Sequence, residues 1–147
     1  MSSFTVISYS PKLGMTSLYN DKFQLTKDFS ISLIEENTNK IYRITISKGA
    51  IWDGLSIPKQ FRWFMSEIDY TNELYSAAGL VHDCLYASEL LSKSISDDIF
   101  RSILRAAGLT KFKASTAHLC VKMFAKCHYG IKHDTNNLRD FITISIQ

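Results

Sequence analysis

Cysteine is scarce in this sequence, and its spacing argues against two classes of protein. Three cysteines are present, Cys84, Cys120 and Cys127, and no two of them form a C-x-x-C pair. An odd number without that spacing argues against a disulfide framework and against a structural zinc site. We therefore expect free thiols that lie on helices and are partly buried as small apolar side chains.

Long hydrophobic runs are absent as well. No apolar stretch approaches the roughly 18 residues that a membrane-spanning helix requires, and the first residues lack the charged segment and apolar core of a secretory signal. The chain has 147 residues, 46% of them hydrophobic, with no internal repeat and no linker-like segment. We expect a single soluble domain over residues 1–147 that stays inside the cell.

Acidic residues are missing from one long segment. No Asp or Glu occurs between Phe100 and His133, although the formal net charge of the whole chain is only +3. The basic residues in this segment are Arg101, Arg105, Lys111, Lys113, Lys122, Lys126 and Lys132. Two interpretations follow: a solvated face whose counter-charges lie elsewhere in the fold, or a surface for an anionic partner such as nucleic acid, phospholipid or an acidic protein.

The first third of the chain and its last residues have the alternation of β-strands. Apolar and polar residues alternate in the segments 4–8, 23–26, 29–33, 41–46 and 141–146. The polar cluster 35–40 separates two of these segments and predicts a hairpin turn. We expect a small antiparallel sheet with one apolar face, to which the C-terminal strand returns.

Three helices are predicted in the remainder. The first runs from Thr71 or Asn72 to Leu91, the second from Ser94 or Ser96 to Ala107, and the third from Lys113 or Ser115 to Tyr129. Glycines at 108 and 130 end the last two. The fold class is therefore α+β: a small antiparallel sheet from the N-terminal third and the C-terminal strand, packed against three main helices.

The first predicted helix carries a His-Asp pair within an apolar run. On a 3.6-residue period His82 and Tyr86 share one stripe, and Asp83 lies about 100° around the helix from His82. One interpretation is a hydrogen-bonded histidine that serves as a structural clamp. The other is a reactive site in which the imidazole is a general base or ligand and Asp83 a metal ligand or an orienting group.

A loop with Asp-Gly, Ser and Pro follows the predicted sheet at 48–58, and it carries Asp53. Because this loop leads from the sheet to the helices, we expect Asp53 to approach the helix of His82. Two carboxylates suit a hard cation such as Ca²⁺ better than zinc, so Asp53 and Asp83 are the candidate metal ligands. In the second helix, Asp97 and Asp98 fall in the first turn, where the helix dipole favours anions.

These motifs resemble a known family. The segments 50–58 and 77–86, followed by Lys93, Asp97 and Phe100, are similar to the bacteriophage and prophage family catalogued as domain of unknown function 1353. The likeness runs from about Phe23 to Ile131, with Lys93 where the family usually has Arg and Ser96 where it usually has Ala. The resemblance implies a phage origin, hence the host cytoplasm or the virion as location, and no assigned activity.

A more distant resemblance concerns chemistry. The pattern His82-Asp83-x-x-Tyr86 on one helix, with Asp97 on the next, is similar to the core of phospholipases A2. That resemblance implies His82 as the base that activates water, Asp83 as a Ca²⁺ ligand, and Tyr86 with Asp97 as supports of the imidazole. A tight turn about Ser92, however, is expected to place Asp97 opposite Glu89, two turns from His82.

Two function classes remain open after the other candidates are weighed. Metal-dependent phosphohydrolases need a further upstream histidine, and none precedes His82. A helix-turn-helix over 102–126 fits poorly at Phe112. The leading interpretation is a phage virion, tail or assembly component that acts through contacts with other phage proteins or with itself. The alternative is a small metal-assisted hydrolase.

Overall fold

The computed structural model describes residues 2–19, 22–52, 73–124 and 138–147. Within these ranges the elements follow the α+β order predicted from the sequence. They are β1 (Phe4–Tyr9), β2 (Met15–Ser17), β3 (Phe23–Leu25), β4 (Phe29–Glu35), β5 (Ile41–Ile46), β6 (Ile51–Trp52), α1 (Glu73–Ser88), α2 (Lys93–Ala106), α3 (Lys111–Phe124), η3 (Leu138–Asp140) and β7 (Ile142–Ile146).

The main sheet has four antiparallel strands in the order β1-β4-β5-β7. The strand β5 has the predicted bounds, and the predicted C-terminal strand does return to the sheet, where Ile144 pairs with Ile44. The predicted hairpin joins β4 to β5, and Asn39 adopts a left-handed φ of 58° in its turn. Asparagine tolerates that conformation better than most residues, which explains its place in the polar cluster.

A second sheet was not predicted. The strand β3, expected to join the main sheet, pairs instead with β2 on one side and β6 on the other. The strands β2 and β6 have only three and two residues. Segments this short cannot show the alternation from which a strand is predicted, so the sequence offered no sign of the second sheet.

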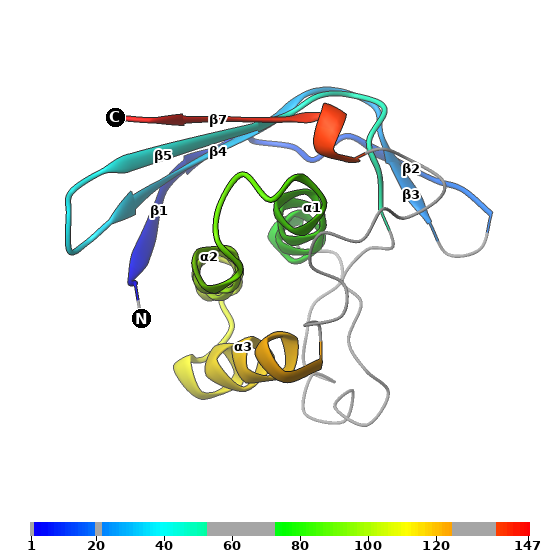
Figure 1. Ribbon diagram of the computed structural model, residues 1–147. Helices are drawn as coiled ribbons and strands as arrows, with labels where there is room; N and C mark the ends of the chain where they lie inside the picture. Colours follow the sequence, from blue (N-terminus) through cyan, green and yellow to red (C-terminus); the bar gives the residue numbers. More distant parts are fainter. Residues whose placement is uncertain (1, 20–21, 53–72, 125–137) are drawn as a thin grey trace.

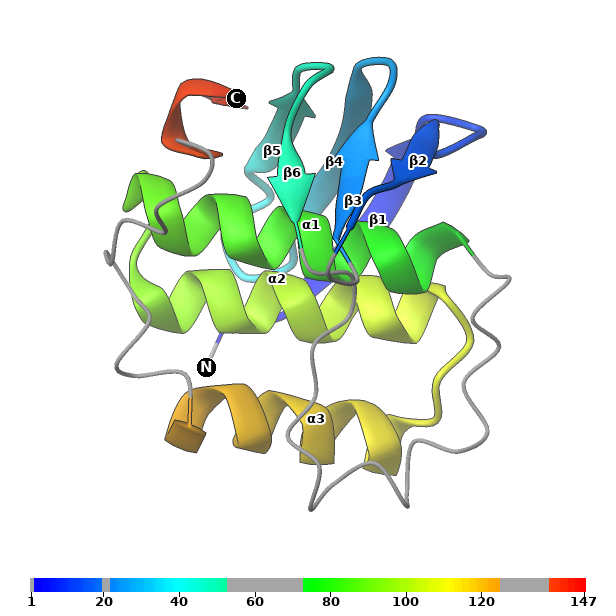
Figure 2. The ribbon, with the colours of Figure 1, turned by 90° about the vertical axis from the view of Figure 1, so that its right-hand side faces the viewer.

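The helices cover one face of the main sheet. Figures 1 and 2 show α1 and α2 side by side beneath the strands, with α3 below α2 on the side away from the sheet. The helix α1 is buried around most of its circumference, because the sheet lies on one side of it and α2 on the other. Fully buried side chains that join the layers include Leu33, Ile44, Ile46, Leu80, Leu85, Ile99 and Ile103.

The turn between α1 and α2 is reached earlier than predicted. The helix α1 ends at Ser88, and Glu89 adopts a left-handed φ of 54°, whereas the sequence favoured helix as far as Leu91. Ser92 then caps α2: its side-chain oxygen accepts a hydrogen bond of 3.2 Å from the backbone N–H of Ile95. The two helices run antiparallel from this corner, which decides which of their residues face one another.

Candidate functional site

A buried carboxylate between α1 and α2 is the centre of the candidate site. His82 Nε2 lies 3.0 Å from Asp97 Oδ1, and the hydroxyl of Tyr86 donates a hydrogen bond to the same oxygen. The second oxygen, Oδ2, accepts a hydrogen bond of 2.8 Å from Lys93 Nζ. Asp97 is only 2% exposed. We call these four residues, His82, Tyr86, Lys93 and Asp97, the Asp97 cluster.

Helical spacing explains how the Asp97 cluster is assembled. His82 and Tyr86 are four residues apart on α1, and Lys93 and Asp97 are four apart on α2, so each helix presents two side chains on one face. The imidazole of His82 also packs between rings, with centroid distances of 4.0 Å to Tyr86 and 4.8 Å to Phe100. Lys93 Nζ lies 5.6 Å from the Tyr86 ring centroid. These contacts hold the imidazole in one orientation.

The expectation that Asp97 lies opposite Glu89, two turns from His82, was wrong. The 3.0 Å distance between His82 and Asp97 shows that they are direct partners. The error came from centring the turn between the helices on Ser92. Because α1 ends at Ser88 and α2 begins at Lys93, the turn is centred nearer the N-terminus, and Asp97 faces residues earlier in α1 than Glu89. His82, Tyr86 and Asp97 therefore meet in one place between the two helices.

The protonation of His82 follows from its surroundings. Burial lowers the pKa of His82 below its ordinary value, while the carboxylate of Asp97 opposes that shift only in part. The ring is therefore neutral near pH 7. Since an ionised carboxylate only accepts hydrogen bonds, the proton of the neutral ring lies on Nε2. The other nitrogen, Nδ1, then carries the basic lone pair, and no described residue bonds to it.

The pKa of Asp97 is shifted in the opposite direction to that of an isolated buried acid. Burial by itself raises the pKa of the Asp97 carboxyl, but the hydrogen bonds from His82, Lys93 and Tyr86 outweigh it, and the pKa lies below its ordinary value. Asp97 is thus a buried, charged group whose two oxygens both have partners. Such a group orients the imidazole and stabilises its protonated form, and it also ties α1 to α2.

The lowered pKa of His82 predicts a pH-dependent stability. An unfolded histidine has a pKa of about 6.5, so below that pH the unfolded chain binds a proton that the folded chain excludes. We expect His82 to lower the free energy of unfolding as the pH falls from about 6.5 toward the folded pKa, with a limiting slope of about 1.4 kcal/mol per pH unit.

Urea unfolding at a series of pH values measures this slope. His82→Gln should remove the contribution of His82, whereas His118→Gln should retain it, since His118 contacts Asp98 and not Asp97. Equal slopes in the wild type and in His82→Gln would contradict the prediction.

A second His-Asp pair lies next to the first. His118 Nε2 is 2.9 Å from Asp98 Oδ1, and the backbone N–H of Ser2 donates a hydrogen bond of 3.0 Å to Asp98 Oδ2. The prediction that Asp97 and Asp98 lie in the first turn as carboxylates at a helix end was wrong, because α2 already begins at Lys93 and has no acidic residue in its first turn. Both aspartates are buried, and each has a histidine partner. Asp97 was named as a partner of the imidazole only through the phospholipase resemblance, and nothing in the local pattern indicated the pair of His118 and Asp98.

Of the two predicted metal ligands, Asp53 and Asp83, the structure describes only Asp83. Asp83 is partly buried on α1, while Asp53 lies outside the described residues, so its approach to His82 stays a prediction. Among the described residues no group of three or more His, Cys, Asp and Glu side chains could hold a metal ion. Of the thiols, Cys84 and Cys120 are free, as expected, but buried rather than partly buried, and Cys127 lies outside the described residues. Burial raises the pKa of the Cys84 thiol well above its ordinary value, which keeps the thiol protonated near pH 7.

The basic segment is only partly accessible. Arg105 and Lys111 are exposed, and Arg105 Nη1 donates a hydrogen bond of 2.8 Å to the Leu109 carbonyl. Arg101 and Lys113 are partly buried, whereas the side chains of Lys122 and Lys126 lie outside the described part. In the ranges that the structure describes, no helix combines the length and the apolar character needed to cross a membrane.

The fold and the Asp97 cluster define an α+β protein with a buried His-Asp site between two antiparallel helices. The sequence profile of the family described as Protein of unknown function (DUF1353) matches residues 23–121, well over half of the chain. The chain belongs to this family, as its motifs predicted. No curated protein and no solved structure shows a significant match to it.

Proposed function

We propose that the chain is a small hydrolase in which His82 acts as general base. The observation that carries this proposal is the bond between His82 Nε2 and Asp97 Oδ1, supported on the same oxygen by Tyr86. A neutral imidazole held by a buried carboxylate, with its second nitrogen not bonded by any described residue, is the arrangement that water activation requires. Acyl esters are the substrate class that this chemistry suits best.

In the proposed reaction, each proton that moves has a defined donor and acceptor. Nδ1 of His82 accepts a proton from water while the water oxygen forms a bond to the ester carbonyl carbon. The bond from that carbon to the leaving oxygen then breaks, and the leaving alcohol takes the proton back from the imidazolium. Asp97 stays ionised and stabilises the imidazolium through Nε2. Lys93 and Tyr86 keep both carboxylate oxygens bonded, so that Asp97 does not turn away from the ring.

The burial of the site restricts how a substrate reaches it. The His82 side chain is only 9% exposed, so little of the ring is open to solvent. Exclusion of water strengthens the interaction between Asp97 and the developing imidazolium. The proposed site therefore suits a slender acyl chain or a single protruding ester group rather than a bulky substrate.

Hydrolysis of p-nitrophenyl esters of graded acyl length, and of phospholipid vesicles, tests the proposal. Because Asp53 and Asp83 were predicted as Ca²⁺ ligands, each substrate is assayed with calcium and with a chelator. For a base of lowered pKa, the rate should be constant above about pH 7 and fall only in the acid range. Absence of turnover on every substrate, with and without calcium, would remove the proposal.

A second candidate function is a phage virion, tail or assembly component that acts through protein contacts. It is favoured by two exposed apolar residues, Phe112 and Leu119, which lie seven positions apart on one side of α3. Arg105 and Lys111 are exposed close to this surface in the sequence and would suit an acidic partner. The resemblance to a phage and prophage family supports the same proposal.

Mass spectrometry of purified virions of the phage or induced prophage that encodes the chain tests the second candidate. A structural component is expected in amounts stoichiometric with other virion proteins. Its absence from particles would instead favour an enzyme that acts within the host cell.

A further inference from the structure

The free edge of the strand β7 has the features of a pairing surface. Within the described part of the chain, β7 is bonded on one side only, to β5, and it ends the main sheet. Its sequence, I-T-I-S-I, contains no charge, no proline and no glycine. Sheet edges are usually blocked by charged residues, proline or bulges, because an open edge binds other strands. None of these devices interrupts β7.

The hydrogen bonds of β7 show which backbone groups face outward. Gln147 exchanges hydrogen bonds of 2.9 and 2.8 Å with Ile41, and Phe141 accepts one of 2.8 Å from Ser47. Residues that bond across an antiparallel pair alternate with residues that do not. The odd-numbered residues of β7 therefore bond to β5, while Ile142, Ile144 and Ile146 direct their N–H and C=O groups toward the open edge.

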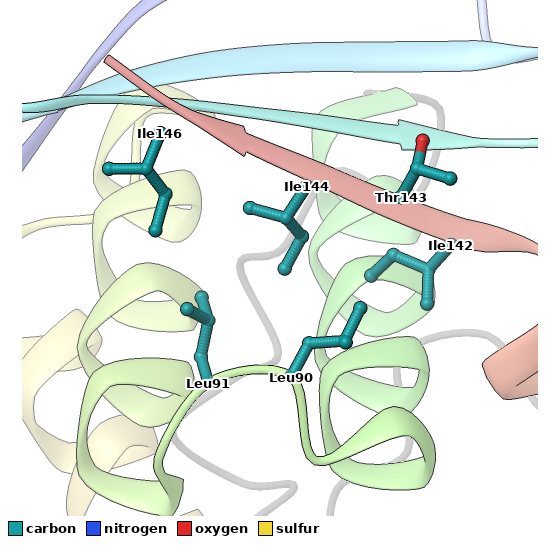
Figure 3. Close-up of a pocket in the computed structure, with 6 residues that line it drawn as sticks. All are labelled: Leu90, Leu91, Ile142, Thr143, Ile144 and Ile146. Carbon is teal, nitrogen blue, oxygen red and sulfur yellow. The ribbon is translucent and has the colours of Figure 1, made fainter.

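The side chains of the same three isoleucines border an apolar groove. Figure 3 shows them pointing from β7 toward Leu90 and Leu91 in the connection between α1 and α2, with Thr143 on the other face. The groove has a volume of about 350 Å³. Leu90 and Ile146 are large apolar residues that remain exposed there. An additional strand beside β7 would cover the apolar atoms that this groove leaves open to water.

We propose that the occupant of this edge is a second copy of the chain, bound through its own β7 in antiparallel orientation. The strand reads the same way in both directions: with a two-fold axis at Ile144, each Ile142 meets Ile146 of the other copy, and each Thr143 meets Ser145. All six isoleucines then lie on the helix side, and the hydroxyl residues pair on the opposite face. The outward backbone groups match this register, because Ile144 bonds with Ile144.

The symmetry of this contact also closes the assembly. A two-fold contact uses the same edge of both copies, so the two main sheets merge into one continuous sheet and β7 has no open edge left. The other edge of the sheet is formed by β1, whose register is interrupted between Val6 and Ser8. Such a bulge twists an edge away from regular pairing, and β1 therefore does not extend the assembly. This inference does not depend on the proposed hydrolase activity.

Sedimentation or light scattering over about a 100-fold range of chain concentration tests the proposal. The wild type is expected to form a dimer of twice its 16.8 kDa mass. Ile146→Lys should weaken the dimer about tenfold or more, because it places a charge at the paired edge. Ile7→Lys is the matched control, since Ile146 is 50% exposed and Ile7, on β1, is 52% exposed. The control should dimerise like the wild type.

A cysteine pair tests the register and does not rely on a destabilised strand. With the axis at Ile144, the two Cα atoms at this position lie about 5.5 Å apart, within disulfide range, whereas those at Ser145 lie beyond about 7 Å. Ile144→Cys should form a covalent dimer under mild oxidation, and Ser145→Cys and the wild type should not. A wild type that stays monomeric at every concentration would overturn the proposal and leave the edge to a strand of another protein. Equal effects of the two lysine variants, or equal crosslinking of the two cysteine variants, would overturn it as well.

Discussion

Replacing His82 by Gln is expected to lower the rate of ester hydrolysis by about 10²- to 10⁴-fold at neutral pH, the contribution typical of a general base. Glutamine can still donate an N–H to Asp97, so the bond between α1 and α2 is kept in part. It has no nitrogen that accepts a proton, and the activation of water is lost. The measurement is kcat and KM on the best ester, and the loss should fall on kcat, because the change removes proton transfer and not binding.

The matched control uses the second His-Asp pair, in which His118 on α3 contacts Asp98 on α2. His118→Gln makes the same substitution in an imidazole that is 2.9 Å from Asp98, but outside the Asp97 cluster. It should leave kcat nearly unchanged. Tyr86→Phe should have an intermediate effect, because it removes one of the bonds that hold Asp97. If both histidine variants lost rate equally and in step with their melting temperatures, His82 would be a structural clamp and not a base.

Asp97→Asn is expected to lower the free energy of unfolding by about 3 kcal/mol or more, the usual cost of removing one partner of a buried ion pair. Asp97 accepts hydrogen bonds from His82, Tyr86 and Lys93, and an amide supplies one acceptor oxygen in place of two. Lys93 also loses its counter-charge. Denaturant unfolding with circular dichroism measures the change, and a cost near zero would show that water satisfies these groups.

A double-mutant cycle separates charge from hydrogen bonding in this cluster. Lys93→Met in the Asp97→Asn background also removes the cation that pairs with Asp97 in the wild type. The double variant should therefore be less destabilised than the sum of the two single variants. Additive effects would mean that Lys93, whose side chain is 24% exposed, reaches water on its own.

The same aspartate predicts part of the acid sensitivity of the wild type. Its folded pKa is lower than that of the unfolded residue, which is about 3.9. The stability that Asp97 contributes is fully present above the unfolded value and is lost as the pH falls through the folded pKa. Asp97→Asn should abolish this part of the acid dependence.

Much of the fold was predictable because it depends on short-range periodicity. The alternation in β5 gave its bounds, and the alternation in the tail identified β7 as a strand of the sheet. The 3.6-residue period likewise placed His82 and Tyr86 on one stripe of α1, and both reach the same oxygen of Asp97. The second sheet escaped prediction because β2 and β6 are too short to carry a period.

The candidate site depends both on helical periodicity and on the packing of the helices against one another. The sequence by itself determined which residues of each helix share a face, because that follows from backbone geometry repeated every few residues. It did not determine that Asp97 faces His82, since this depends on where α1 ends and on the left-handed conformation of Glu89. Only the tertiary structure decided the partners of Asp97 and Asp98, because buried carboxylates are paired by the packing of α1, α2 and α3 against one another.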